Sequence, residues 1–201
     1  FAPWYREFHL NRWLYEEGYL VLKDGVRPSN VEWLMGVDWS RTRAYGLGIN
    51  GLYLNLKGRE KNGIVRPGAE ADELIDEIAE KLESYRDPKN DKRVIVKAYK
   101  ASETYHGPHV ETAPDIVMGY GWGYRGSDAT ATGAIPAEIV DDNLKKWSGD
   151  HCADYHHVPG VLFTNKPITH ESPSLYDMAP TILRELGVDK TSWMIGRSVF
   201  Q

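Results

Sequence analysis

Short apolar segments of strand length alternate with segments of helical periodicity, and this alternation constrains the fold more than any other feature. The clearest helix is predicted over 69–85, where apolar residues recur every three or four positions with charges between them. Strands are predicted near 94–98, 114–119 and 160–164, which are short and mostly apolar. The pattern predicts an α/β fold around a largely buried sheet.

Other segments fill in this outline. A short helix is predicted near 9–17 and two short strands near 43–47 and 51–56. The regular part of a last helix should start near Pro180, because proline is costly deeper inside a helix. The glycine-rich stretch 119–135 is expected to be an irregular loop of the kind that often carries function. The predicted core comprises Leu74, Ile78, Val94, Val96, Ile116, Val117, Val161, Leu162, Phe163, Ile182, Leu183 and Leu186.

Length and charge narrow the class of protein. The 201 residues suit a single domain, 1–201, or one large part of a domain. The net charge of −5 argues against a general nucleic-acid coat, which needs a basic field. No apolar run is long enough to predict a membrane span. The one cysteine, Cys152, excludes an internal disulfide framework and fits a reducing cytoplasm.

The densest group of polar residues is 150–157, in which six of the eight residues are potential metal ligands. Imidazole, thiolate and carboxylate groups all suit zinc. The spacing matches no closed structural zinc site, which needs two separated pairs of ligands. One interpretation is that one or two of these residues join ligands elsewhere in the chain. The alternative is a polar loop whose histidines face water.

Other candidates for chemistry are weaker. His106 and His109 flank a rigid Gly-Pro turn without a third ligand nearby, and His9 and His170 stand alone. The sequence contains neither a Gly-x-Ser-x-Gly nucleophile elbow nor a glycine-lysine phosphate loop. Cys152 directly follows a histidine, but adjacent residues rarely face each other as a Cys–His dyad. None of these features predicts a nucleophile.

The glycine-rich stretch also carries aromatic and basic side chains. Tyr120, Trp122, Tyr124 and Arg125 could line a substrate pocket. The same side chains would also serve as ordinary packing. Both interpretations remain open from the sequence.

Five blocks of sequence, taken in order, form a pattern that runs nearly from end to end of the chain. They are 8–14 with 17–20, 42–46 with 53–60, 113–117, Trp147-Ser-Gly-Asp-His-Cys with 158–165, and 175–188 with its Ala-Pro-Thr helix. Together these blocks resemble enzymes of the alkaline phosphatase superfamily. The branch they resemble most is the prokaryotic type I phosphodiesterase and nucleotide pyrophosphatase group.

This resemblance implies a fold and a chemistry. It implies an alkaline-phosphatase-like core sheet flanked by helices, with 24–70 and 85–135 as inserted cap segments. Two divalent ions, zinc first and manganese second, would assist hydrolysis of phosphoric esters. Nucleotide or other phosphodiesters rank first as substrates, followed by phosphomonoesters or sulfate esters. By its place in the motif, His151 is the expected late metal ligand.

The resemblance also implies that the site is incomplete within this chain. The Thr or Ser nucleophile and the remaining ligands, including an Asp-His pair, are expected upstream of Phe1. The chain would then be the C-terminal part of an enzyme, with the preceding half of the polypeptide as its partner. It would be inactive alone and could lack bound metal. His151 should nevertheless lie beside residues 1–5, because the upstream pair and His151 would share one metal cluster.

A second hypothesis comes from another class of protein. The chain could be a non-catalytic domain that binds a ligand or partner through the loop 119–135. The missing nucleophile is the feature that favours this alternative.

Overall fold

The computed structural model describes residues 1–200 and divides the chain into two compact units. The first is Phe1–Pro159 and the second begins at Gly160. Helices and strands are mixed in the chain, as the predicted α/β class requires. The sequence predicted one domain, so the division at residue 160 is a new feature. Each unit is described by itself below.

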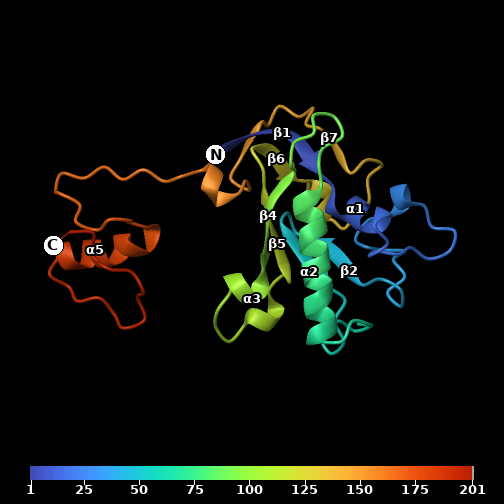
Figure 1. Cartoon of the computed structure of the whole chain (residues 1–201), viewed down its shortest axis with the longest axis horizontal. Coiled ribbons are helices and arrows are strands. Elements are labelled where there is room, and N and C mark those ends of the chain that lie inside the picture. The colour runs from blue at the N-terminus through green and yellow to red at the C-terminus, as the bar shows by residue number, and fades with distance from the viewer. Residues whose placement is uncertain (201) are drawn as a thin grey trace. The chain divides into compact units, whose positions relative to one another are not determined.

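A four-stranded sheet in the first unit is centred on β1 (Ala2–Phe8). One neighbour, β6 (Gly123–Gly126), runs parallel to β1, and the other, β7 (Val140–Asp142), runs antiparallel. The short β8 (Gly149–Asp150) pairs with the first residues of β1. The two ends of β1 therefore meet different parts of the segment 140–150 (Figure 1).

A second four-stranded sheet is entirely antiparallel. Its order is β2 (Ala44–Leu47), β3 (Gly51–Leu54), β5 (Ile116–Tyr120) and β4 (Ile95–Lys100). These are the strands predicted from the apolar runs of the same region. They all lie within the two segments expected as cap insertions, so those segments build a large part of this unit.

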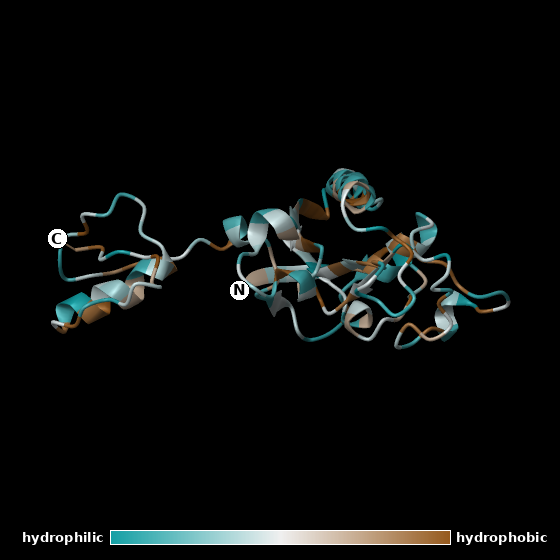
Figure 2. Ribbon diagram, turned by 90° about the horizontal axis from the view of Figure 1, so that it is seen from below, coloured by the Kyte–Doolittle hydropathy of each residue, from teal (hydrophilic) through white to brown (hydrophobic). Residues whose placement is uncertain are grey.

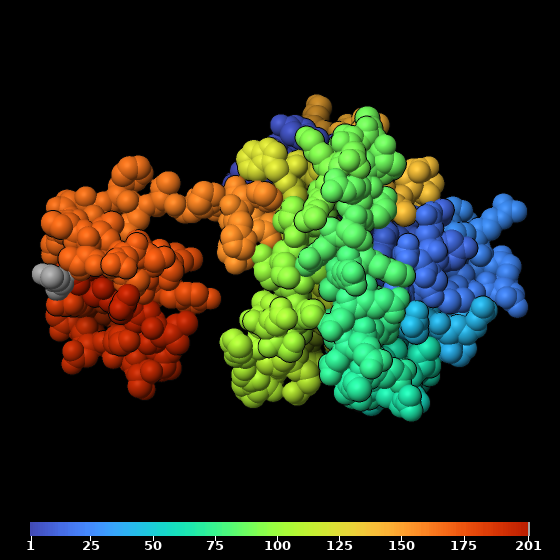
Figure 3. Space-filling model, viewed as in Figure 1, coloured from blue at the N-terminus to red at the C-terminus, as the bar shows by residue number. Residues whose placement is uncertain are grey.

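The longest helix, α2 (Ala69–Ser84), lies alongside β4 and covers one face of the unit (Figures 1 and 3). Its buried face contains Leu74, Ile78 and Leu82, at the spacing that predicted the helix. In Figure 2 the hydrophobic colour recurs along the strands of this unit. The other helical segments of this unit are α1 (Leu10–Glu16), α3 (Ala101–Thr104), α4 (Asp128–Ala131) and the 3-10 turns Pro28–Asn30, Val110–Thr112 and Tyr155–His157.

The second unit has one α-helix, α5 (Met178–Glu185), preceded by the 3-10 turn Leu175–Asp177. Pro180 lies in the first turn of α5, as expected for a proline that a helix tolerates. Among residues 1–200 no helix is both long and apolar enough to cross a membrane.

The predicted strand over 160–164 is wrong. These residues have no regular secondary structure, and Val161 and Phe163 are 84% and 91% exposed. A strand needs a neighbour to satisfy its backbone groups, and an apolar run alone does not supply one. The core prediction is also wrong for the segment 160–164 and for the outer face of α5. Val161, Leu162, Phe163, Ile182 and Leu186 are exposed, and Leu183 is half-buried.

The core prediction holds in the first unit. Leu74, Ile78, Val94 and Ile116 are buried there. Val96 and Val117 are half-buried. Val117 alternates along β5 with the buried Ile116 and Met118, which point to the opposite face of the sheet.

Candidate functional site

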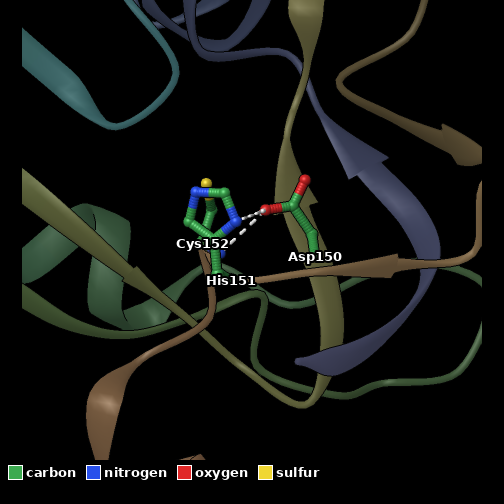
Figure 4. A group of neighbouring side chains, drawn as sticks. All are labelled: Asp150, His151 and Cys152. Atoms are coloured by element: carbon green, nitrogen blue, oxygen red, sulfur yellow. Dashed lines mark hydrogen bonds and ion pairs between the residues drawn. The ribbon is translucent and has the colours of Figure 1, made fainter.

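The predicted metal ligand His151 follows β8 directly. Pairing of β8 with β1 places Asp150 opposite Ala2. The Asp150 Oδ1 atom accepts a hydrogen bond from the Cys152 backbone N–H at 2.9 Å, which turns the chain sharply. Figure 4 shows the Asp150 carboxylate directed toward the His151 ring, with Cys152 beside it. One ligand atom from each of the three residues lies within 4.8 Å of the others.

His151 lies next to the start of the chain, as expected. Its ring meets the edge of the Phe1 ring, with the centroids 6.0 Å apart. The Nδ1 atom is 3.7 Å from Asp150 Oδ1, and 82% of the side chain is exposed. The neighbourhood of His151 and residues 1–5 is therefore confirmed. An exposed imidazole at this position is accessible to a metal ion.

A buried arginine supports the acidic member of this group. Arg125, on β6, has its Nε atom 2.7 Å from Asp150 Oδ2 and its guanidinium over the Trp4 ring. Burial alone would raise the pKa of Asp150, but the hydrogen bonds from Cys152 and the charge of Arg125 lower it overall. Asp150 is thus an ionised carboxylate that is held in place from both sides.

The pKa of the Cys152 thiol is shifted in the opposite direction. Burial, followed by the hydrogen bond and charge of Asp150, raises its pKa to about 11. A thiol that stays protonated at neutral pH is a poor nucleophile. The raised pKa does not favour Cys152 as a nucleophile.

The rest of the polar segment 150–157 faces a different part of the unit. Asp154 is 3% exposed and accepts a 2.7 Å hydrogen bond from the Tyr99 hydroxyl. Its other oxygen, Oδ1, lies 2.8 Å from His156 Nδ1. These three side chains border a shallow pocket of about 460 Å³ that also includes His157. A carboxylate that orients an imidazole at a pocket is an arrangement suited to proton transfer.

This second group was not predicted, because the sequence showed only a run of ligand-type residues. The partner Tyr99 lies 55 positions away in the sequence. Only the fold shows that Asp150 and Asp154 serve separate groups of side chains.

The four side chains predicted to line a substrate pocket are not alike. Tyr120 is fully buried, and its hydroxyl donates to the Ile49 carbonyl. Tyr124 is 4% exposed, and its hydroxyl contacts the Asp87 carboxylate at 2.9 Å. Arg125 is 7% exposed and is paired with acidic side chains. Trp122 is 53% exposed, so it is the accessible member of the set, and substrate binding by the four stays a prediction.

The isolated histidines also differ from one another. His106 and His109 are exposed in a loop beside a small pocket. His170 lies in the second unit, with Nε2 3.7 Å from Asp177 Oδ2. His9 is 4% exposed and lies near two carboxylates, Glu7 and Asp141. This last group was not predicted, because Asp141 follows His9 by more than a hundred residues.

Comparison with known proteins found no relative of this chain. No family model, no curated protein and no solved structure matches the chain.

Proposed function

We propose that this chain is the C-terminal portion of a metal-dependent phosphoric ester hydrolase of the alkaline phosphatase superfamily. The observation that carries the proposal is the position of His151 beside Phe1. The Asp-His pair of such an enzyme would come immediately before Phe1. Two catalytic metals lie about 4 Å apart, and each ligand bond is about 2 Å long. A ligand just upstream of Phe1 and the His151 ring would therefore be within reach of one metal cluster.

The residues at the end of β8 would contribute to such a cluster. Two divalent ions, zinc first and manganese second, would activate a Thr or Ser nucleophile and offset the charge that develops on the phosphoryl group. In this chain, His151 would hold one ion through its exposed imidazole. Asp150 would position the loop, because its carboxylate accepts a hydrogen bond from the Cys152 backbone N–H and forms an ion pair with Arg125. One histidine is not enough for a bimetal site, so the remaining ligands must come from the preceding part of the polypeptide.

The second unit is consistent with a piece of a larger domain. Large apolar side chains of this unit are not buried among its own residues, including Phe163, Leu175 and Trp193. Large apolar side chains that a unit leaves exposed can contact another part of a protein. We therefore infer that an alkaline-phosphatase-like core also needs the preceding half of the polypeptide. The single cysteine agrees with a cytoplasmic setting for this enzyme.

Phosphodiesters, including nucleotides, rank first as substrates, and phosphomonoesters or sulfate esters follow. The segments 24–70 and 85–135 would shape the substrate side. The alternative function is binding of a ligand or partner through the loop 119–135. It is favoured by the exposed Trp122, whose ring meets that of His157 at 6.3 Å at the edge of the 460 Å³ pocket.

The gene upstream of Phe1 provides the first test. An Asp-His pair and a Thr or Ser motif there support the hydrolase, whereas their absence supports the binding domain. In the longer polypeptide, His151→Ala should lower metal content and turnover of a nitrophenyl phosphodiester together. His106→Ala, which changes an exposed histidine of another loop, is the matched control. Full activity of the His151→Ala enzyme would refute the assignment.

The isolated chain provides the second test. Residues 1–201 should give no turnover above a metal-only blank with zinc or manganese. Activity that follows the protein through purification would show that the chain contains its own nucleophile.

A further inference from the structure

The end of β1 brings three potential metal ligands to one face of the first sheet. Glu7 and His9 are two residues apart, and side chains at this spacing share a face of a strand. Asp141, on β7, pairs directly with Glu7, so its side chain points to that face as well. The pairing continues beyond the strand, because the His9 backbone N–H donates to the Ile139 carbonyl at 2.8 Å. One ligand atom from each of the three side chains lies within 4.8 Å of the others.

The imidazole of His9 is the least satisfied group in this arrangement. Its side chain is 5% exposed, and both ring nitrogens are buried without a hydrogen-bond partner among residues 1–200. Buried polar atoms of this kind normally have a partner. The Nε2 atom lies 3.2 Å from Asp141 Oδ1, but the two atoms are not aligned as a hydrogen bond. Two ligand atoms bound to one tetrahedral zinc ion at about 2.0–2.2 Å would be about 3.3–3.5 Å apart, close to this spacing.

The charges at this position also call for a cation. Two carboxylates directly opposite each other on neighbouring strands repel. Glu7 is partly neutralised, because the Lys145 ammonium lies 2.9 Å from its Oε1 atom and is shared with Asp128 at 3.1 Å. Within residues 1–200, its Oε2 atom has only a long 3.4 Å hydrogen bond from the Ser127 hydroxyl. Among residues 1–200, the one basic side chain paired with Asp141 is His9.

We propose that Glu7, His9 and Asp141 form a site for a first-row divalent metal ion, with zinc as the reference ion. One imidazole and two carboxylates favour such an ion over magnesium or calcium, which prefer oxygen ligands alone. Glu7 would bind through Oε2, which leaves Oε1 to Lys145. The Asp141 side chain is 49% exposed, so the ion has access to solvent and room for a water ligand. This site would join β7 to the centre of the sheet, and it is separate from the group around His151.

A titration with zinc and cobalt tests the proposal on the chain 1–201. Asp141→Asn removes one ligand at a half-exposed position, where folding should be preserved. Asp142→Asn is the matched control, because it removes the same charge from the next residue of β7, whose side chain points to the other face. Zinc affinity should fall by about tenfold or more in the Asp141→Asn protein and stay unchanged in the Asp142→Asn protein. Zinc should also raise the melting temperature of the control protein more than that of Asp141→Asn.

A His151→Ala background separates this site from the one proposed for phosphate ester hydrolysis. Cys152 is the only cysteine and lies in the group around His151, so a thiolate-to-cobalt charge-transfer band would assign the ion to that group. Cobalt at Glu7, His9 and Asp141 should lack this band and should persist in a His151→Ala background. In the His151→Ala background, His9→Gln should abolish cobalt binding while the circular dichroism spectrum stays native.

Three results would overturn the proposal. The first is equal zinc affinity of the Asp141→Asn and Asp142→Asn proteins. The second is loss of all metal binding in the His151→Ala background, which would assign the metal to the other group. The third is absence of zinc binding altogether.

Discussion

The two units of the chain use apolar residues in opposite ways. In the first unit, apolar side chains from both sheets and from α2 form one continuous core that includes Phe8, Leu82 and Tyr120. In the second unit, the run 161–163 is entirely apolar, yet Val161 and Phe163 are exposed to solvent. The difference is one of partners rather than of composition, because only the first unit has strands and a helix that cover one another.

Polar groups hold the second unit together instead. The buried Asp177 carboxylate accepts hydrogen bonds from the backbone N–H groups of Ser174 and Arg197, each at 2.8 Å. The Thr181 hydroxyl donates to the Asp177 carbonyl at 2.6 Å and accepts from the Val199 N–H at 2.9 Å. These bonds close the C-terminal segment onto α5. The comparison predicts that the first unit is sensitive to lost volume and lost buried charge, whereas the second is sensitive to lost hydrogen bonds.

The largest expected effect is on a buried charge of the first unit. Asp87 is fully buried, pairs with Arg6, and accepts a hydrogen bond from Tyr124. Asp87→Ala would leave the Arg6 guanidinium without its buried partner, which should cost about 3–5 kcal/mol of unfolding free energy. Urea denaturation followed by tryptophan fluorescence measures this loss. Asp76→Ala, at an exposed position of α2, should change stability by less than about 0.5 kcal/mol. Equal stability of the two variants would contradict the role assigned to Asp87.

The next effect compares two isoleucines on helices. Ile78 on α2 is completely buried, whereas Ile182 on α5 is 58% exposed. Ile78→Ala should cost about 2–5 kcal/mol of unfolding free energy, because it leaves a cavity in a packed core. Ile182→Ala should cost less than about 1 kcal/mol. The pair of variants is measured by thermal and urea denaturation. A cost for Ile182→Ala as large as that for Ile78→Ala would show that the second unit has a packed apolar interior after all.

The same contrast explains what the sequence could predict. The helix over 69–85 and four strands of the second sheet were predicted correctly, because their apolar spacing reflects burial against neighbours. The segment 160–164 has the same local pattern without a neighbour, so its strand prediction failed. The central strand β1 was not predicted at all, because it carries Arg6 and Glu7 among its aromatic residues.

The candidate sites show the same limit. The position of His151 beside Phe1 was predicted through the resemblance, which supplied the long-range relation. His9 was dismissed as isolated, because its neighbour Asp141 is brought close only by the pairing of β1 and β7. Asp154 and Tyr99 were missed for the same reason, since their hydrogen bond joins a loop to a distant strand. The spacing of residues along the chain predicts helices and strands. Groups of side chains from distant parts of the chain depend on how those helices and strands are arranged.

A smaller effect is expected from Thr181→Val in the second unit. Valine has nearly the same shape, but it leaves the buried Val199 N–H without an acceptor. An unsatisfied buried donor costs about 1–3 kcal/mol. This loss should appear as faster amide hydrogen exchange at Val199, while exchange in α2 stays unchanged. Faster exchange in α2 as well would contradict a local role for the Thr181 hydroxyl.

The smallest expected effect is a local loss of stability at acidic pH, and it is confined to the second unit. The hydrogen bonds from the backbone of Arg197 and Ser174 hold the pKa of Asp177 below its ordinary value. Because the pKa is lower in the folded state than in the unfolded state, the stabilisation is complete above the unfolded value of about 4. It is lost as pH falls through the lower folded value. Exchange at the Arg197 amide, corrected for its intrinsic pH dependence, should therefore accelerate in acid. In the Asp177→Asn protein the rate should be faster throughout but insensitive to pH in this range, because an amide does not titrate. A wild-type rate that stays flat in the same range would mean that the Asp177 carboxylate does not hold the C-terminal segment.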